Sequence, residues 1–499
     1  MYWLIHKILK LNWAMIGRII GFVLKVEACL LVFPLIVNYL YGESIGFAYI
    51  VTIGLCFGIG SLLSLTDKKK NIIFSRDGLV AVGLAWIIMS ALGALPFFIS
   101  QEIPNYIDCL FETISGFTTT GSSILNDVEA LSHANIFWRS LTHWIGGMGI
   151  LVFVLAVASG SNERMMHVMR AESPGPTIGK LVPRMKQSAA ILYNIYLFLT
   201  IACVIFLCLG GMPLFDSLCH AFGTAGTGGF GIKNTSVAYY DSAYIDAVIT
   251  IFMILFGINF NVYYFILIRD FKAAFKNEEF KAYIGIIIAC IVMIGINIYP
   301  LYGNVADVLR YSSFQVGSII TTTGYSTANF DLWPSFSKMI LLLLMVLGAS
   351  AGSTGGGIKV SRFLIIVKKV KLDIQRLIHP QKVNAITMDG KLVDEEVVTQ
   401  ITSYFCCFML IMATCLLLVS LDNLDMETTI SAVMSCIGNI GPGFSLCGPL
   451  ANFDCFSYFS KLVLSAAMLI GRLEIYPILI FMFPVIRLPE AIKKPKRRD

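Results

Sequence analysis

Four short Thr/Gly quartets recur along this chain, and together they could bind a cation. They are Thr118–Gly121, Ala225–Gly228, Thr321–Gly324 and Gly438–Gly441, and their last glycines are 107, 96 and 117 residues apart (121 to 228 to 324 to 441). Backbone carbonyls and threonine hydroxyls from four such loops around one axis would replace the hydration shell of a monovalent cation. Glycine permits the backbone angles that turn carbonyls toward an axis. The residues expected to form this site are Thr119, Thr120, Gly121, Thr227, Gly228, Thr322, Thr323, Gly324, Asn439, Ile440 and Gly441.

Each quartet has the same surroundings: an apolar span, a short segment that opens near an acidic residue, the quartet, and a second apolar span. The acidic residues are Asp108, Asp216, Asp307 and Asp425, and each could stabilise the N-terminus of a short helix. So short a segment cannot cross a membrane, but it can enter and return where protein or a wet cavity shields its backbone. A repeat of about 100 residues is too long for a solenoid, so we interpret it as one membrane unit repeated four times.

The composition is that of an integral membrane protein. The 499 residues are 57% hydrophobic and 14% charged, with a mean hydropathy of +0.78. Since a spanning helix needs about 20 apolar residues, we expect ten spans besides the four short re-entrant segments. The net charge of +6 comes from Lys and Arg in the loops between spans, which follow the positive-inside rule. The expected partner is therefore the lipid bilayer and not a nucleic acid.

The predicted fold is an all-α integral membrane protein with four tandem helix–pore loop–helix repeats around one pore, preceded by an N-terminal transmembrane hairpin. The hairpin is predicted at residues 1–76 and the first three repeats at 77–182, 183–277 and 278–390. The fourth repeat and a basic C-terminal tail take residues 391–499.

The outgoing span of the third repeat is interrupted. Its apolar parts, 339–347 and 358–367, flank a run that contains Gly348, Gly352, Gly355, Gly356 and Gly357. Five glycines in ten residues do not sustain a helix. The run is either a loop between two short helices or a flexible segment in the permeation path. We favour the second interpretation because neither half is long enough to cross alone.

Two polar residues lie within other spans. Arg472 is near the centre of the last span, where an arginine costs about 2.5–3.5 kcal/mol, so it should face a cavity or a partner. Glu474 is two residues further and not on the same helix face, which favours a pore-facing Arg472 over a structural pair. His143 fits a hydrogen-bonded packing histidine better than a member of a proton relay.

The sequence offers little for catalysis or cofactor binding. Residues 226–231 match GxGxxG, but no βαβ unit surrounds them. The thirteen cysteines form no CxxC motif and are typical of buried apolar positions. We find no HExxH and no nucleophile motif. We therefore expect neither an enzyme nor a cofactor in this chain.

Several of these segments resemble the Trk/Ktr/HKT potassium transporter superfamily. They are residues 117–122, 227–230, 322–325, 439–443, 172–176, the glycine run and Gly471-Arg472, and the N-terminal hairpin resembles the Trk branch. The resemblance implies that Gly121, Gly228, Gly324 and Gly441 form one K⁺-selective filter, with the glycine run and Arg472 restricting the path beneath it. It also implies a homodimer in the bacterial cytoplasmic (inner) membrane that carries TrkA-like nucleotide-binding regulatory subunits. Ile440 departs from the pattern because it replaces a threonine.

The leading hypothesis is potassium uptake through a gated, channel-like pathway, with K⁺ as the transported ion. The alternative is an ion-coupled secondary transporter of another solute, in which the broken span would bind substrate near the midplane. Four filter-like loops favour the pore. The sequence leaves open whether H⁺ or Na⁺ coupling accompanies the membrane potential.

Overall fold

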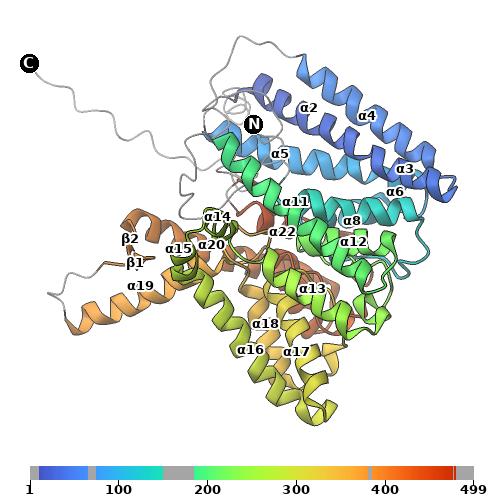
Figure 1. The fold of residues 1–499 in the computed structure, drawn as a ribbon. Helices are drawn as coiled ribbons and strands as arrows, with labels where there is room; N and C mark the ends of the chain where they lie inside the picture. The colour runs from blue at the N-terminus through green and yellow to red at the C-terminus, as the bar shows by residue number, and fades with distance from the viewer. Residues whose placement is uncertain (1–10, 66–74, 150–184, 380–384, 476, 479–499) are drawn as a thin grey trace, which may run out of the picture.

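The computed structural model describes residues 11–65, 75–149, 185–379, 385–475 and 477–478 (Figure 1). Regular structure in these residues is helical, except for one antiparallel hairpin of the two-residue strands β1 (Thr387–Met388) and β2 (Lys391–Leu392). Six helices are long and apolar enough to cross a membrane, or seven if one bent pair counts as a span. The prediction of an almost all-helical membrane protein is therefore confirmed.

The N-terminal hairpin lies along one side of the helix bundle (Figure 1, blue). It consists of α2 (Trp13–Leu30), α3 (Val32–Tyr41) and α4 (Gly46–Ser64). A Cβ atom at Gly21 would lie 2.6 Å from the carbonyl oxygen of Gly60, and one at Gly60 would lie 2.7 Å from that of Gly21. The two glycines therefore permit a close approach of α2 and α4, as small residues do in membrane helix pairs.

Four short helices each follow a long one. The long helices are α5 (Ser75–Gly93) with its extension α6 (Leu95–Ile99), α11 (Met185–Leu209), α16 (Glu278–Tyr302) and α20 (Glu395–Val419). The short helices are α7 (Tyr106–Phe117), α12 (Leu214–Gly226), α17 (Val305–Ile320) and α21 (Met426–Gly438). With 12 to 16 residues the short helices are about 18–24 Å long, less than the hydrocarbon core of a bilayer.

The predicted acidic residues are at the N-termini of these short helices. Asp108, Asp216 and Asp307 lie in the first turns of α7, α12 and α17. Asp425 is the N-cap of α21, where its Oδ2 accepts a hydrogen bond from the backbone N–H of Thr428 at 2.9 Å. This part of the sequence prediction is confirmed.

Four outgoing helices follow the short ones, and all four end early. They are α8 (His133–Gly147), α13 (Ala243–Phe256), α18 (Ser335–Val346) and α22 (Tyr458–Arg472), with lengths of 15, 14, 12 and 15 residues. Sequence reasoning singled out an interruption in the third outgoing span, and the structure has one in the second outgoing span as well. The predicted continuation of α8 to residue 160 lies outside the described residues, as do the segments 172–176 and 479–499.

The second outgoing span bends by 89° between α13 and α14 (Phe260–Leu267). Asn259 caps α14, because its Oδ1 accepts a hydrogen bond from the N–H of Asn261 at 3.0 Å. At Gly257 the Tyr283 hydroxyl would lie 2.3 Å from a Cβ atom, so no larger residue fits there. The break thus results from Gly257 and Asn259, which interrupt an otherwise apolar run.

The third outgoing span resumes as α19 (Val360–Ile378), which extends away from the other helices at the lower left of Figure 1. Shorter elements complete the described chain: α15 (Phe271–Lys276), η2 (Ser236–Tyr240), η3 (Phe330–Leu332), η4 (Ser420–Asp422) and η5 (Ser445–Cys447). All thirteen cysteines are free thiols.

Candidate functional site

Each of the four short helices ends in a turn with the same backbone conformation. We number these turns 1 to 4 along the chain: Thr119–Gly121, Thr227–Gly229, Thr322–Gly324 and Asn439–Gly441. The first residue of each is left-handed, with φ of 55°, 54°, 58° and 55°. The last residue is a glycine with φ of 83°, 71°, 87° and 110°. Because only glycine adopts positive φ without steric cost, the last position explains the recurring glycine.

Matching hydrogen bonds fix the register of the four turns. In each, the backbone N–H of the middle residue donates to the carbonyl oxygen five residues earlier, at 2.8 to 3.0 Å. The pairs are Thr120 to Ser115, Gly228 to Gly223, Thr323 to Ser318 and Ile440 to Ser435. The same local backbone is thus built four times from different side chains.

This register corrects one predicted residue. Gly228 was expected to match Gly121, Gly324 and Gly441, but it occupies the middle position of turn 2. Gly229, which sequence reasoning missed, is the left-handed glycine. The segment contains glycines at 226, 228 and 229, so composition alone did not fix the register. The end of α12 at Gly226 decides it.

The four turns adjoin one another in cyclic order. A Cβ atom at Gly121 would lie 1.9 Å from the carbonyl oxygen of Gly228, in turn 2. The corresponding distances are 1.9 Å from Gly229 to the oxygen of Thr323, 2.0 Å from Gly324 to that of Ile440, and 2.9 Å from Gly441 to that of Thr120. Every turn therefore presents its middle carbonyl to the glycine of a neighbouring turn, and the series closes.

The carbonyl oxygens of the first two positions in the turns are without hydrogen-bond donors among the described residues. These eight oxygens belong to Thr119, Thr120, Thr227, Gly228, Thr322, Thr323, Asn439 and Ile440. All eight residues are buried. Since buried carbonyls are normally paired, a closed set of free ones fits a monovalent cation.

The threonine hydroxyls at the middle positions of turns 1 and 3 bond within the protein, in contrast to the free carbonyl oxygens. Thr120 Oγ1 lies 2.8 Å from Thr118 Oγ1, and Thr323 Oγ1 lies 2.7 Å from Thr321 Oγ1. These hydroxyls thus connect turns 1 and 3 to the ends of their own helices. Ile440 lacks such a brace, but it still contributes its carbonyl.

Turn 4 is instead fixed by the side chain of Asn439. Its Nδ2 donates to Thr120 Oγ1 at 2.9 Å and to the carbonyl oxygen of Met468 at 2.9 Å. Ser122 Oγ in addition donates to the carbonyl oxygen of Gly441 at 2.9 Å. Turns 1 and 4 are thus linked through side chains.

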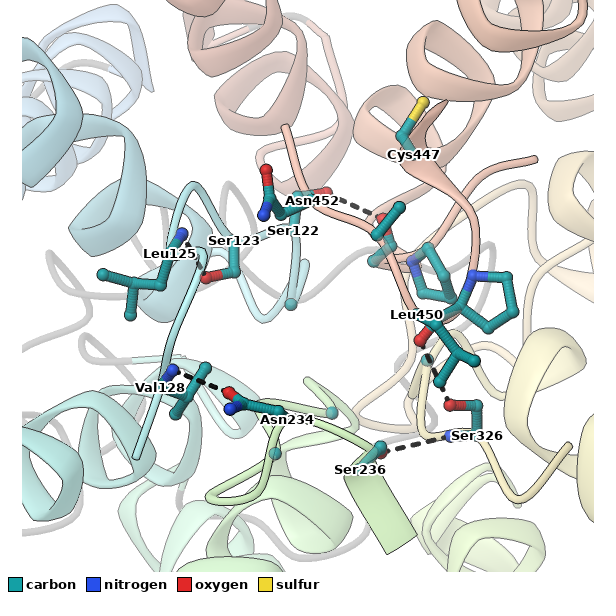
Figure 2. Close-up of a pocket in the computed structure, with 18 of the residues that line it drawn as sticks. Ser122, Ser123, Leu125, Val128, Asn234, Ser236, Ser326, Cys447, Leu450 and Asn452 are labelled. Carbon is teal, nitrogen blue, oxygen red and sulfur yellow. Dashed lines mark hydrogen bonds between the residues drawn. The ribbon is translucent and has the colours of Figure 1, made fainter. Parts of the chain in front are cut away.

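A cavity of about 150 Å³ lies on one side of the turns (Figure 2). The left-handed glycines Gly121, Gly229, Gly324 and Gly441 all line it, and Gly228 does not. Ser122, Ser123, Asn234 and Ser326 surround the opening in Figure 2, and each comes from the chain that follows a turn. Figure 2 also shows the hydrogen bonds from Val128 N–H to Asn234 and from Ser326 N–H to Ser236.

The glycine run contacts the other side of the turns. The N–H of Gly356 donates to Thr322 Oγ1 at 2.7 Å, and a Cβ atom there would lie 2.6 Å from the carbonyl oxygen of Gly438. A short parallel bridge pairs Leu347 with Ile358, so the run leaves the helices and returns as one closed loop. We call Gly348–Gly357 the glycine loop.

The break in the second outgoing span provides a seat for the glycine loop. The N–H of Ser350 donates to the carbonyl oxygen of Gly257 at 3.1 Å. Thr354 Oγ1 donates to that of Phe256 at 3.2 Å. The N–H of Phe260 donates back to the carbonyl oxygen of Gly352 at 3.1 Å. The carbonyl and amide groups freed by the break are therefore satisfied by the loop.

Arg472 is the last residue of α22, so the expectation that it lies within a continuous helix is wrong. Its Nη1 donates to the carbonyl oxygen of Thr354 at 2.8 Å. Its Nη2 donates to the carbonyl oxygens of Gly147, at 2.9 Å, and Gly146. Arg472 thereby connects α22 to the glycine loop and to the end of α8. Glu474 pairs with Arg362.

Two charged residues beside the glycine loop were not singled out from the sequence. Lys359, which is 5% exposed, directs Nζ back to the carbonyl oxygens of Gly355 and Gly356. Glu279 Oε1 accepts hydrogen bonds from the N–H groups of Ala351 at 2.7 Å and Ser361 at 3.0 Å. Its Oε2 accepts one from Asn259 Nδ2 at 3.3 Å. Glu279 therefore holds the glycine loop, the start of α19 and the start of α14 together.

His143 is a hydrogen-bonded packing residue, as expected. Its Nδ1 lies 2.8 Å from the carbonyl oxygen of Gly116, and its Nε2 accepts the N–H of Phe230 at 3.3 Å. A ring that donates at one nitrogen and accepts at the other is neutral. His143 thus connects the end of α7 to the residue after turn 2.

The comparisons with known proteins agree with one another. A family model described as "TrkH: Cation transport protein" matches residues 45–491. The chain is 33% identical over 481 residues to the Trk system potassium uptake protein TrkH of Escherichia coli (strain K12), covering 95% of this chain and 99% of the relative. It is 32% identical over 469 residues to TrkG of the same organism, covering 92% and 96%. The crystal structure of the potassium transporter TrkH from Vibrio parahaemolyticus matches with a TM-score of 0.85 at 32% identity, covering 95% and 99%.

Proposed function

This chain belongs to the TrkH family of cation transport proteins, and from that premise we propose that it is a potassium uptake protein with a single four-turn filter and a gated path. It is a multi-pass protein of the bacterial cytoplasmic membrane. The transported ion is K⁺, and the chain itself is a transport protein and not an enzyme.

The filter in this proposal is the ring of four turns. Its carbonyl oxygens replace the water around a K⁺ ion, and the left-handed glycines aim those oxygens at the axis. The observation that carries the proposal is the set of eight buried carbonyls without donors among the described residues. The filter residues are the predicted ones, with Gly229 added as the glycine of turn 2.

The gate in this proposal is the glycine loop with Arg472. The loop contacts the turns through Gly356 on the side away from the cavity, where it obstructs an ion leaving the filter. Gly348, Gly352, Gly355, Gly356 and Gly357 give it the freedom to move. Arg472 holds it through the carbonyl oxygen of Thr354 and is itself anchored to the end of α8 through those of Gly146 and Gly147. Opening requires that these contacts break.

The assembly is part of the proposal. Two copies of the chain form a homodimer, and cytoplasmic TrkA-like subunits that bind nucleotides control the gate. The curated relatives carry the description "Trk system", which supports the presence of further components. The four tandem units of 77–182, 183–277, 278–390 and 391–499 are the proposed architecture around the pore.

Uptake in cells tests the proposed function. Cells stripped of their own potassium systems should regain growth at low potassium, and should take up rubidium, when they express this chain with its regulatory subunits. Uptake of another solute driven by an ion gradient, with no rubidium flux, would favour the secondary transporter.

A further inference from the structure

A buried ion pair lies behind the seam between turns 1 and 2. Glu112 of α7 and Arg139 of α8 are joined by a 2.5 Å contact between Oε1 and Nε. Their side chains are 0% and 4% exposed, and in the described part of the chain no other ion pair has both partners below 5%. Two charges in so dry a place are retained against a large desolvation cost, so their other contacts matter.

Glu112 holds the chain that leaves turn 1. Its Oε1 accepts a hydrogen bond from Ser123 Oγ at 3.1 Å, and its Oε2 accepts one from the N–H of Ile124 at 3.1 Å. Ser123 is two residues beyond Gly121. The carboxylate therefore fixes where the chain goes immediately after the free carbonyls of turn 1.

Arg139 holds the chain that leaves turn 2. Its Nη1 donates to the carbonyl oxygen of Gly231 at 2.8 Å. Its guanidinium carbon lies 3.6 Å from the centre of the Phe230 ring. Gly231 is two residues beyond Gly229, so the cation restrains turn 2 at the position where its partner restrains turn 1. One ion pair thus connects the chain segments that follow two adjacent turns of the ring, turns 1 and 2.

The corresponding positions beside the other turns do not hold such an ion pair. Counting eight residues back from each middle turn residue gives Glu112 (120 − 8), His220 (228 − 8), Gln315 (323 − 8) and Ala432 (440 − 8). Counting seven residues from the N-caps of the outgoing helices gives Arg139 (132 + 7), Ile249 (242 + 7), Leu341 (334 + 7) and Leu464 (457 + 7). The charges occur at one seam only, so general packing of the repeat does not require them.

We propose that Glu112 and Arg139 are positioning residues that set the width of the ring at the seam of turns 1 and 2, and thereby the preference for K⁺ over Na⁺. They act through Ser123, Ile124 and Gly231, and Arg139 in addition lines the cavity beside the ring. This inference rests on the proposed function. Arg139 donates hydrogen bonds in two directions, from Nε to the Glu112 carboxylate and from Nη1 to the carbonyl oxygen of Gly231. This position therefore needs the planar, forked guanidinium group of arginine.

The test compares three variants in purified, reconstituted protein, with K⁺ and Na⁺ competing against rubidium influx. R139K keeps the charge but loses the fork, and the double variant E112M/R139M removes both charges at similar volume. The matched control is D246N/R310M, which removes an ion pair between α13 and α17. In the described part of the chain, the side-chain hydrogen bonds of this pair extend to Asp241 and to no residue of the four turns. Insertion and homogeneity are checked by size-exclusion chromatography.

We expect both seam variants to lose at least fivefold in the ratio of K⁺ to Na⁺ affinity, with a smaller change in the maximal rubidium rate. The control should change that ratio less than twofold. A purely structural ion pair would lower protein yield and rate without moving the ratio. An unchanged ratio in R139K and in the double variant, with an active parent, overturns the inference alone. A correctly folded parent that carries no rubidium even when it is reconstituted with its regulatory subunits overturns the proposed function together with it.

Discussion

The ring of turns and the glycine loop are both rich in glycine, yet they are held by different kinds of contact. The ring repeats one backbone hydrogen bond four times, from the middle residue of each turn to the carbonyl five residues earlier. The glycine loop depends on long side chains that reach its backbone: Arg472 and Glu279 come from other helices, and Lys359 comes from the start of α19, two residues beyond the loop. Glycine serves both conformation and close approach in each region, since Gly352 and Gly357 of the loop also have positive φ, at 70° and 65°.

This difference separates two tasks. A filter distinguishes ions only while its oxygens keep their positions, and local backbone bonds within each turn favour that. A gate must change position, and contacts made by single side chains can break one at a time. Variants that alter the ring should therefore change ion preference, whereas variants that alter the tethers should change flux.

The largest effect is expected at the glycines of the ring. Gly121→Ser, Gly229→Ser and Gly324→Ser each place a Cβ atom within 2.0 Å of a neighbouring carbonyl oxygen at positive φ. We expect each to reduce K⁺ over Na⁺ preference by about tenfold, a change of about 1.4 kcal/mol. Competition of K⁺ and Na⁺ against rubidium influx measures it. Gly42→Ser is the matched control, since Gly42 has φ of +68° and nothing within 4 Å. Unchanged ion preference in all three variants would contradict the filter assignment.

Removal of the arginine tether comes next. Arg472→Ala deletes three hydrogen bonds from a charged donor, of which each contributes about 1.5–3 kcal/mol. If half the free energy of one such bond favours the closed state over the open one, its loss removes about 0.75 kcal/mol or more from that preference. Rubidium influx without regulatory subunits should then rise about fourfold or more, with ion preference unchanged. Arg376→Ala on α19 serves as control. Stable insertion with influx equal to the parent would show that the glycine loop is structural.

A smaller increase in flux is expected at Glu279. Glu279→Gln keeps one oxygen for the two backbone N–H groups, so those bonds weaken without being lost, while its amide nitrogen no longer accepts the hydrogen bond from Asn259 Nδ2. The usual difference between charged and neutral bonds, about 1 kcal/mol, predicts a rise of about two- to fivefold. Glu278→Gln is the control on the adjacent residue, whose carboxylate pairs with Lys368. Equal influx in both variants would remove Glu279 from the gate.

The smallest effect is expected at the rim of the cavity. Lys233 Nζ donates to Glu129 Oε2 at 3.0 Å, and this hydrogen bond lowers the pKa of the Glu129 carboxyl. A lowered pKa means that the contribution is present above the ordinary value of about 4.3 and is lost as the pH falls through the lower folded-state value. External pH between 7 and 5 should therefore leave uptake by the parent and by Lys233→Gln the same. A difference between them in that range would assign the rim a larger role.

The positions of the four turns could be predicted because each depends on a short stretch of neighbouring residues. The Thr/Gly quartets and the acidic residue before each one are visible without any contact information, and Asp108, Asp216, Asp307 and Asp425 all occupy helix N-termini. The register of turn 2 was not accessible in this way. It depends on where α12 ends, and Gly226, Gly228 and Gly229 all tolerate the required backbone.

The broken helices and the tethers were harder to predict. Residues 243–267 are a nearly continuous apolar run, so the sequence pattern gives little sign of a break. Among the residues that the structure describes, the backbone carbonyls that the break frees at Gly257 and Phe256 are paired only by the glycine loop, which lies about 90 residues further along the chain. Glu279 follows Glu278 at the start of α16, where an acidic pair is ordinary for a helix N-terminus. Its role depends on Ala351 and Ser361, more than 70 residues away.

The common end point of the short helices has an electrostatic consequence. Four helices finish at the ring, and the carboxyl end of each carries about half a negative charge. On the same side, Lys359 and Arg472 bring two positive charges to buried backbone carbonyls at the glycine loop and the end of α8. If this arrangement is the closed state of the proposed gate, the protein supplies its own positive charges beneath the carbonyl ends of the four helices. When the proposed gate opens, a transported K⁺ ion takes the place of a charged side chain of Lys359 or Arg472. The net charge beneath the filter therefore need change little between the two states.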